Sequence, residues 1–508
     1  MITAFKISRI DILLFILFFW GIVEGYFNSE LQLGSIFYSE WLLLFLIYAF
    51  VSRTTKDSDY ALFFLLSIGF IQACVAFAQN FNVIASGNDF FPVTGFMTNP
   101  ASLGCMQSVA TVSSWSLVSK RIDSFRWSSA ALYAGISVFI ALTVILSASR
   151  AAFVSVIIGL SIMLLKRNEV SIKKLLLWLL MLFLIVLCLL SVLRIDSVKS
   201  RILIWNVSLR LFSEHPMFGL GPGNFNMQYM LSQAEYFSQF PESSFVAVAD
   251  NVAYPYNEFI HIAVEFGLVG IVLVAMIIHS VCRAPKCEEV LPLLASLLAF
   301  SCFSFPTYDK NVSWLFPFIL GVSGCGETSC SFNIKPAVSI SAVLAAIVLS
   351  LGNVFYLVAL HGKMQGYLSN DKILDPQCYD VFDKTWTDHD VNRLFFNKLV
   401  NQNEQLNVDA MRKIFPMSET WCYWGSIMED IGEPCIAEFY YRTSACMVPT
   451  RIRPRYQLWK MMIGQNRDGE AHELSCEILT MPIKCENTFT LRVYREIRDY
   501  YNLEECHE

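Results

Sequence analysis

The stretch that decides the fold runs from Asn257 to Val281 and has the sequence NEFIHIAVEFGLVGIVLVAMIIHSV. About 20 consecutive, mainly apolar residues are enough for a helix to cross the hydrocarbon core of a membrane. Its two acids, Glu258 and Glu265, both lie in its first half. Ionisable groups inside a span are costly and usually face a cavity or another helix. The stretch therefore predicts a transmembrane helix whose first half faces the protein interior.

Similar apolar blocks occur on both sides of this stretch. Of the 508 residues, 55% are hydrophobic and 16% are charged, whereas soluble domains have about 25% charged residues. We predict about eleven spans: 12–27, 37–51, 60–79, 98–119, 128–148, 151–166, 175–195, 257–281, 289–305, 312–325 and 337–360. The first is interpreted as a span and not as a cleaved signal, because no small-residue cleavage site follows it. The predicted fold class is an all-α, polytopic transmembrane bundle.

The basic residues of the connecting segments alternate along the chain. They occur before span one, and after spans two, four, six and eight: Lys6, Arg9, Arg53, Lys56, Lys120, Arg121, Arg126, Lys166, Arg167, Lys173, Lys174, Arg283 and Lys286. The positive-inside rule then predicts a cytoplasmic N-terminus. An odd number of spans places the C-terminal tail outside, together with the long loop 196–256. That loop also contains basic residues, but long loops obey the rule weakly.

From about residue 362 the chain becomes more polar, which divides it into a membrane domain, 1–361, and a soluble helical domain, 362–508. A set of tail residues has the spacing of a tetratricopeptide repeat: Trp421, Trp424, Gly425, Ala437, Tyr441, Ser444 and Pro449. A shift by the repeat length of 34 brings Ala437 onto Ala471. Helices around Val381–Trp386 and Val391–Val400 are candidates for a degenerate repeat. The alternative is an unrelated helical hairpin domain, because only one repeat is well marked.

Charge and cysteine content exclude some classes of partner. The net charge of −6 gives no reason to expect nucleic acid. No CxxC pair occurs among the 15 cysteines, so no metal site is predicted. Seven cysteines lie in the tail, where an external location would permit disulfides: Cys378, Cys422, Cys435, Cys446, Cys476, Cys485 and Cys506.

Three segments contain residue types that suit chemistry on a phosphate. The first, Ser147–Ala152, has Ser149 and Arg150 between two spans. A guanidinium offers a bidentate fork for phosphate, and on the predicted topology Arg150 is external. The plainer interpretation is an arginine that extends from the membrane to the interface.

The second segment is the long loop, which contains Arg201, Arg210 and the run Gly219-Leu220-Gly221-Pro222-Gly223. The arginines add positive charge over a site, and the glycines allow close approach of the backbone. No strand leads into the run, so it does not predict a nucleotide-binding loop. An ordinary loop remains the alternative, and His215 is interpreted as a loop residue rather than a base.

The third segment opens the span quoted above. Asn257, His261 and Glu265 are four residues apart, so they share one helical face, and Glu258 lies close to Glu265 in projection. These groups predict either a reaction centre or a hydrogen-bonded cluster that only packs helices.

In this order the three segments resemble the O-antigen ligase and O-antigen polymerase superfamily. The resemblance includes Ser147–Ala151, Arg201–Trp205, Pro216–Phe225 and Asn257–Gly270, with Thr94–Ala101 upstream. It covers roughly residues 65 to 330, and the tail resembles members that end in helical repeats. The order and spacing of the motifs carry the resemblance, since each motif alone is weak.

The resemblance implies a metal-independent, inverting glycosyltransferase without a cofactor, in the inner membrane of a bacterium. Its implied donor is an undecaprenyl-pyrophosphate-linked glycan, and its implied acceptor is lipid A-core, another glycan or a protein hydroxyl. It implies that Arg150 and Arg201 bind the pyrophosphate, since fixed guanidinium groups offset the charge of a departing anion. The residues expected to contact substrate are Ser149, Arg210, Gly221, Gly223, Tyr256, Asn257 and His261.

The sequence departs from the family at one position. Ligases have His-Asn where this chain has Tyr256-Asn257, and a neutral tyrosine with a pKa near 10 is a poor base. On a continuous helix, His261 would point about 140° away from position 256. Glu258 or Glu265 is then the expected base, unless leaving-group activation suffices or ligase activity is absent. The competing classes are a transporter or flippase of lipid-linked sugars, which predicts paired discontinuous helices in two related halves, and a non-catalytic membrane scaffold.

Overall fold

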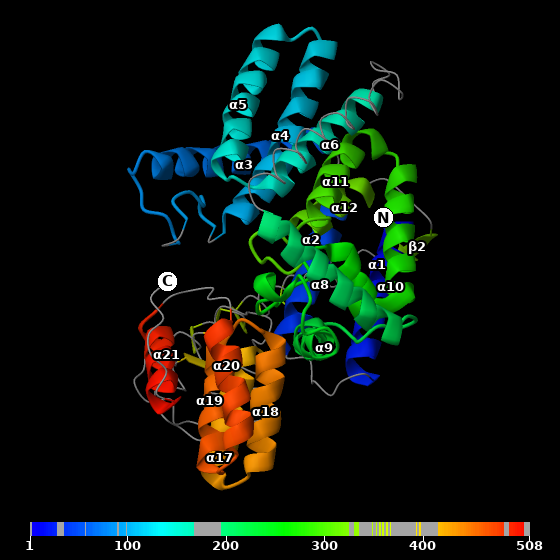
Figure 1. Ribbon diagram of the computed structural model, residues 1–508. Coiled ribbons are helices and arrows are strands. Elements are labelled where there is room, and N and C mark those ends of the chain that lie inside the picture. The colour runs from blue at the N-terminus through cyan, green and yellow to red at the C-terminus, as the bar shows by residue number, and fades with distance from the viewer. Residues whose placement is uncertain are drawn as a thin grey trace.

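The part of the chain that the structure describes is mainly helical (Figure 1). The computed structural model describes residues 3–27, 35–55, 57–88, 91–97, 99–166, 195–324, 330–334, 415–481 and 487–501, with isolated positions between 348 and 397. Within these residues the exceptions are a short 3-10 turn, η1 (Val246–Val248), and two antiparallel strands, β1 (Thr3–Ile7) and β2 (Cys330–Ile334). The all-α class is confirmed, and the strand pair is an addition that the sequence did not predict.

Helices occupy each predicted span that falls within the described residues. They are α1 (Arg9–Phe27), α2 (Ser35–Thr54), α3 (Ser58–Asn80), α4 (Pro100–Asp123), α5 (Trp127–Leu146), α6 (Arg150–Lys166), α10 (Glu258–Arg283), α11 (Cys287–Ser301) and α12 (Leu315–Gly324). Of these, α3, α5 and α10 are long and apolar enough to cross a membrane, and α6 and α12 are shorter apolar helices. The predicted spans 175–195 and 337–360 lie largely outside the described residues, so the count of eleven stays a prediction.

Helix α4 lies at the centre of the bundle, in contact with α3, α5, α6 and α11. Except for the half-buried Ser119, its serines are buried, and they bond within the protein instead of facing lipid. Ser155 of α6 illustrates this, since its hydroxyl contacts Ser108 of α4 at 2.9 Å and Ser296 of α11 at 2.8 Å. Surrounding helices satisfy these polar groups, which explains how a serine-rich helix occupies the middle of an apolar bundle.

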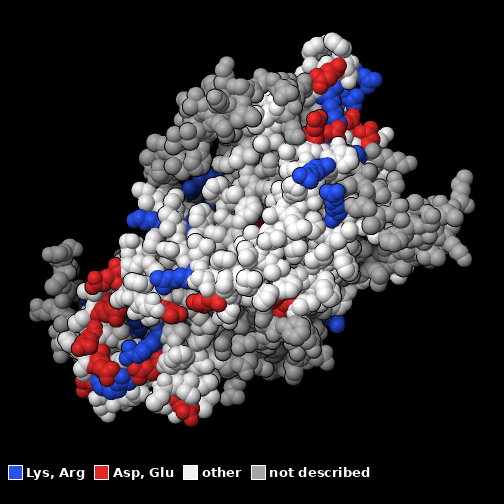
Figure 2. Space-filling model, turned by 90° about the vertical axis from the view of Figure 1, so that its right-hand side faces the viewer, with Lys and Arg blue, Asp and Glu red and all other residues white. Residues whose placement is uncertain are grey.

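Ion pairs and hydrogen bonds connect the helix ends in two separate groups. In one set, Asp11 pairs with Arg53 at 2.7 Å, and Lys120 pairs with Asp59 at 2.7 Å and Glu289 at 2.5 Å. In the other, Glu40 pairs with Lys310 at 3.1 Å, Ser102 bonds to Asp309, and Thr307 bonds to Glu258. Each set joins ends that an alternating topology places on one side. On the face shown in Figure 2, charged side chains gather in two zones, with a largely uncharged surface between them.

The tail forms a stack of antiparallel helices: α17 (Ser418–Ile431), α18 (Pro434–Met447), α19 (Ile452–Gly464), α20 (Asp468–Thr480) and α21 (Thr488–Tyr501). Helices α17 and α19 start 34 residues apart, as do α18 and α20. A Cβ at Gly425 would lie 2.4 Å from the ring of Tyr441, so this crossing requires glycine. The pairing agrees with a 34-residue repeat, and membership of the tetratricopeptide class stays a prediction. The predicted upstream helices and the boundary near 361 lie outside the continuously described residues.

The tail shares a hydrophobic core with the long loop. In the loop, α8 (Ile195–Glu214) and α9 (Phe225–Gln239) pack with α10, and α18 packs on α9 (Figure 1). Gln233 of α9 is buried, and its amide donates to the carbonyls of Asp250 at 3.1 Å and Met447 at 2.6 Å. Arg451 of the tail pairs with Asp250 at 3.3 Å. Loop and tail are therefore one packed unit.

Cysteines of this unit are not cross-linked where the structure describes them. Cys422, Cys435, Cys446 and Cys476 are free thiols, and the other three tail cysteines lie outside the described residues.

Candidate functional site

The site is built around a break in α10. Gly267 has φ 61° and ψ −159°, which interrupts the helix inside its apolar stretch. Loop residues pair with the backbone freed by the break: Leu220 N donates to Val264 O at 2.8 Å, Gly221 N to Glu265 O at 2.9 Å, and Leu268 N to Pro216 O at 2.9 Å. Irregular backbone at membrane depth is tolerated only where protein or a cavity covers it. Here the glycine-rich loop supplies the cover.

Two glycines permit this approach. A Cβ at Gly219, whose φ is 86°, would lie 2.5 Å from the carbonyl oxygen of Glu265. A Cβ at Gly267 would lie 2.4 Å from the carbonyl oxygen of Met217. Contacts this short cannot accommodate a side chain, so the two segments cross only as glycines.

The break presents Glu265 to a ring of donors. Its Oε1 accepts from Gly223 N at 2.8 Å, from Phe225 N at 3.4 Å and from His261 Nε2 at 3.2 Å. Its Oε2 accepts from the hydroxyl of Tyr308. Burial and the Glu265 charge raise the pKa of Tyr308 well above its usual value, so this phenol remains a donor. The carboxylate of Glu265 is thereby saturated with donors and fixed in place.

Glu258 and His261 complete a buried cluster, with exposed fractions of 3% and 2%. Glu258 Oε1 accepts from both the amide and the hydroxyl of Thr307, at 2.7 and 2.5 Å. The imidazole of His261 stacks on Tyr308, with ring centroids 4.4 Å apart. Among the described residues its Nδ1 has no hydrogen-bond partner, and it lies 3.9 Å from Glu258 Oε2, beyond hydrogen-bond distance.

Arg150 and Arg201 form the positive side of the site. Burial and the neighbouring charge of Arg150 lower the pKa of Arg201, which shows that the two guanidinium groups act on each other. Arg201 lies over the ring of Tyr256, 5.7 Å from its centroid. Tyr256 in turn meets Phe305 edge-on at 5.4 Å. Within the described residues, neither arginine has a carboxylate partner, so their charge is open to a ligand.

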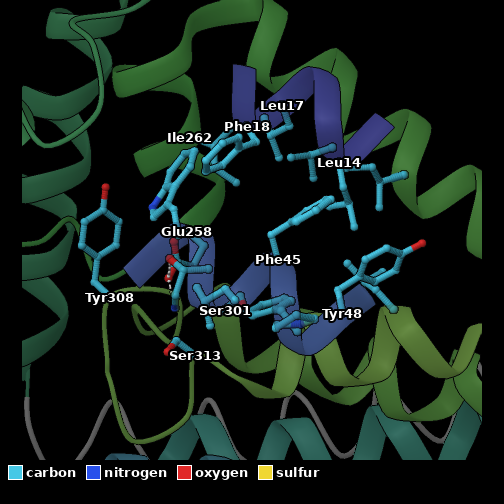
Figure 3. Close-up of a pocket in the computed structure, with 18 of the residues that line it drawn as sticks. Leu14, Leu17, Phe18, Phe45, Tyr48, Glu258, Ile262, Ser301, Tyr308 and Ser313 are labelled. Atoms are coloured by element: carbon cyan, nitrogen blue, oxygen red, sulfur yellow. Dashed lines mark hydrogen bonds between the residues drawn. The ribbon is translucent and has the colours of Figure 1, made fainter. Parts of the chain in front are cut away.

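A cavity of about 680 Å³ opens beside the acidic cluster. Its walls come from α1, α2, α10, α11 and α12 and are mainly apolar, with Leu14, Leu17 and Phe45 among them (Figure 3). The polar groups Glu258 and Tyr308 lie together at one end, with Glu40 and Lys310 also in the lining. The cavity therefore joins an apolar compartment to the ionisable groups of α10.

The structure places the other predicted residues as follows. Ser149 precedes α6, where its hydroxyl accepts from Ala152 N at 3.4 Å. Asn257 caps α10 by accepting from Phe259 N at 2.9 Å and Ile260 N at 3.1 Å. The amides of Gly221 and Gly223 bond to Glu265.

Arg210 and His215 lie apart from the cluster. Arg210 is exposed over Tyr236, 5.1 Å from the ring centroid, at the end of α9. His215 is exposed in the turn that follows α8. The described contacts therefore give neither residue a direct part in the acidic cluster.

Three residues of the site were missing from the sequence-based set: Asn226, Thr307 and Tyr308. A cavity of about 20 Å³, the size of one water molecule, lies between Asn226, His261 and Tyr308. The buried Oδ1 of Asn226 has no partner among the residues that the structure describes. Thr307 and Tyr308 belong to a polar run between two predicted spans, on the side predicted for the long loop, and that signal could have identified them.

The fold and the site together define a class: a polytopic helical membrane protein with a buried acid–imidazole cluster beside a large apolar cavity. Residues 135–275 match the O-antigen ligase family, so the chain carries an O-antigen ligase domain. The matched segment contains Arg150, Arg201 and the acidic cluster. Thr307, Tyr308 and most of the cavity wall lie outside it. No curated protein gives a significant match to the chain.

Proposed function

We propose that this protein transfers a glycan from a polyprenyl-pyrophosphate carrier to a hydroxyl acceptor on the external face of the membrane. The O-antigen ligase domain supports membrane glycan transfer as the type of activity. We further propose that the reaction takes place on the external side of the membrane and that the C-terminal tail lies on the same side.

The observation that carries the proposal is the cavity that ends on the ionisable cluster. In a polyprenyl-pyrophosphate glycan, only the pyrophosphate separates the apolar chain from the sugar carbon that reacts. An enzyme for such a donor needs an apolar compartment next to its reacting groups. The cavity of about 680 Å³ has this character, and Glu258, His261 and Glu265 line its wall.

Charge divides the site into two parts. The acids of α10 would repel a pyrophosphate, whereas Arg150 and Arg201 have no carboxylate partner among the described residues. We therefore assign the arginines to the pyrophosphate and the acidic cluster to the acceptor. Positioned positive charge then stabilises the pyrophosphate as it departs, which is where negative charge develops.

The acceptor side includes the tail. Its helices pack on α9 of the long loop, so a tail that binds an acceptor would hold it above the site. Lipid A-core, another glycan chain and a protein hydroxyl all fit this arrangement. A ligase and a polymerase differ only in which of these they use.

The test is transfer in nanodiscs that contain the purified protein, an undecaprenyl-pyrophosphate oligosaccharide and candidate acceptors. Ile278 lines the cavity, whereas Met276 on the same helix points outward. Ile278→Trp should raise the KM for the donor by about tenfold or more, since one large side chain occupies the apolar compartment. Met276→Trp should behave as wild type. Equal KM values for the two variants would reject the cavity as the donor site.

A transporter of the same lipid-linked glycan is the second candidate, because discontinuous helices such as α10 are typical of transporters. Among the described helices, α10 alone has such a break, and its partner is a loop and not a second broken helix. Movement of labelled donor across a proteoliposome membrane without an acceptor would favour the transporter.

A further inference from the structure

The proposed reaction needs a base that takes the proton of the acceptor hydroxyl. Tyr256 precedes α10 and has φ 53°, so the helical-wheel angle between positions 256 and 261 does not apply. Its ring lies under Arg201. Glu265 already accepts hydrogen bonds on both carboxylate oxygens. An open basic atom for the acceptor hydroxyl is therefore not found on Glu265, and the neutral phenol of Tyr256 is a poor base.

His261 does offer such an atom. Its Nε2 faces the carboxylate of Glu265 at 3.2 Å, so we assign the ring proton of the neutral imidazole to Nε2. The lone pair then lies on Nδ1, which is buried and has no hydrogen-bond partner in the part of the chain that the structure describes. Nδ1 faces Glu258, and both residues line the large cavity.

The arrangement is similar to the carboxylate–histidine pair of a serine hydrolase, in which a carboxylate orients the histidine that acts as base. One ring nitrogen bonds to a fixed carboxylate, and the other is left to take a proton. The groups that face the imidazole are Glu258 and Glu265 on α10, Tyr308 from the α11–α12 loop and Tyr254 from the segment before α10. The two carboxylates stabilise a positive charge on the ring, and the stacked Tyr308 fixes its plane.

We propose that His261 is the catalytic base of this protein, with Glu265 as its positioning residue; this inference rests on the proposed function. The acceptor O–H bond breaks, and its proton passes to His261 Nδ1. The acceptor oxygen forms a bond to the anomeric carbon of the donor sugar. The bond from that carbon to the pyrophosphate breaks, and its electron pair leaves with the polyprenyl pyrophosphate. The imidazolium then returns its proton to solvent.

The experiment compares His261→Gln with His279→Gln in the nanodisc assay. Glutamine preserves a donor for Glu265 but removes the basic nitrogen. His279 lies on the exposed face of the same helix, so it controls for the substitution itself. For His261→Gln, kcat should fall by about 10²–10⁴-fold, the usual contribution of general base catalysis. The KM for the donor should change less than threefold, and His279→Gln should match wild type.

The pH profile separates a catalytic role from a structural one. Wild-type kcat/KM should fall at acid pH as one proton occupies Nδ1, and His261→Gln should lose this acid limb. If His261→Gln retains wild-type kcat while Arg150→Ala is inactive, the base assignment is wrong and the proposed function stands. If His261→Gln also loses binding of a photoreactive undecaprenyl-pyrophosphate probe, the residue is structural and the assignment is wrong. If wild type transfers no glycan, both proposals fail.

Discussion

The two ends of the helix bundle carry charged clusters of opposite design. At one end, Lys120 pairs with Asp59 and Glu289, and the three side chains remain 33%, 34% and 28% exposed. At the other end, the side chains of His261 and Glu265 are 3% and 1% exposed, and Nδ1 of the imidazole has no hydrogen-bond partner within the described residues. The first cluster neutralises itself in contact with water, whereas the second is buried and incomplete.

This difference is the reason to place the candidate site at the second end. Buried polar atoms are nearly always hydrogen-bonded, because an unpaired buried group costs about 1–3 kcal/mol. Asn226 Oδ1 and His261 Nδ1 have no hydrogen-bond partner among the described residues, and both residues line the cavities at the site end, on the side of Arg150 and Arg201. Nε of Arg121 at the other end is also buried without a partner among the described residues, so the candidate site is distinguished by unpaired polar atoms that line a cavity.

Among the variants that test this comparison of the two ends, Arg150→Ala should have the largest effect on activity. Removal of one charge-assisted contact to a developing anion costs about 2.7–4 kcal/mol, or about 10²–10³ in rate. Arg150→Lys should recover little, since an ammonium cannot form the bidentate fork. The measurement is initial rate of glycan transfer, normalised to folded protein in the membrane. Full activity of Arg150→Ala would show that this arginine does not bind the pyrophosphate, and the contrast between the two ends would then have no bearing on function.

Gly267→Ala tests the helix that connects the two ends. The positive φ and the contact with Met217 should destabilise the protein by on the order of 3 kcal/mol. Thermal melting of the detergent-solubilised protein and its membrane yield report this loss. Gly135→Ala in α5 is the control, since a Cβ there meets no atom within 4 Å. Equal stability of the two variants would show that the loop does not pack into the break.

Gln233→Ala tests whether the hydrogen bond from α9 to the Met447 carbonyl holds the tail on the long loop. The substitution removes the donor to the Met447 carbonyl and should cost about 1–3 kcal/mol, the penalty for an unpaired buried group. Limited proteolysis should then release the tail faster. Gln239→Ala, at the exposed end of the same helix, should leave the rate unchanged. Identical cleavage of both variants would mean that the shared core holds the tail without this bond.

Lys120→Met should have the smallest effect. Partly exposed ion pairs contribute about 0–1 kcal/mol, so melting temperature should change little and glycan transfer should remain at the wild-type rate. Gly135→Ala in α5, where a Cβ meets no atom within 4 Å, provides a baseline for the assay. A loss of transfer comparable to that of Arg150→Ala would show that both clusters act in the reaction.

Much of the fold was determined by the sequence alone. Apolar length predicts the membrane helices, because the thickness of the hydrocarbon core sets the number of residues required. The helical class and the resemblance to O-antigen ligases were both predicted correctly. Gly219 and Gly267 could be recognised as motif positions in the sequence, because a close approach of two backbone segments requires glycine.

Only the tertiary structure decided how the polar groups are used. A sequence shows that Glu258, His261 and Glu265 lie on neighbouring turns, but it does not show which oxygens are already occupied. That depends on donors far along the chain: Gly223 and Phe225 from the long loop, and Thr307 and Tyr308 from the α11–α12 loop. The strand pair β1–β2 and the core shared by loop and tail have the same origin. Helical periodicity is local and can be found in a sequence window, whereas hydrogen-bond satisfaction is a property of the folded chain.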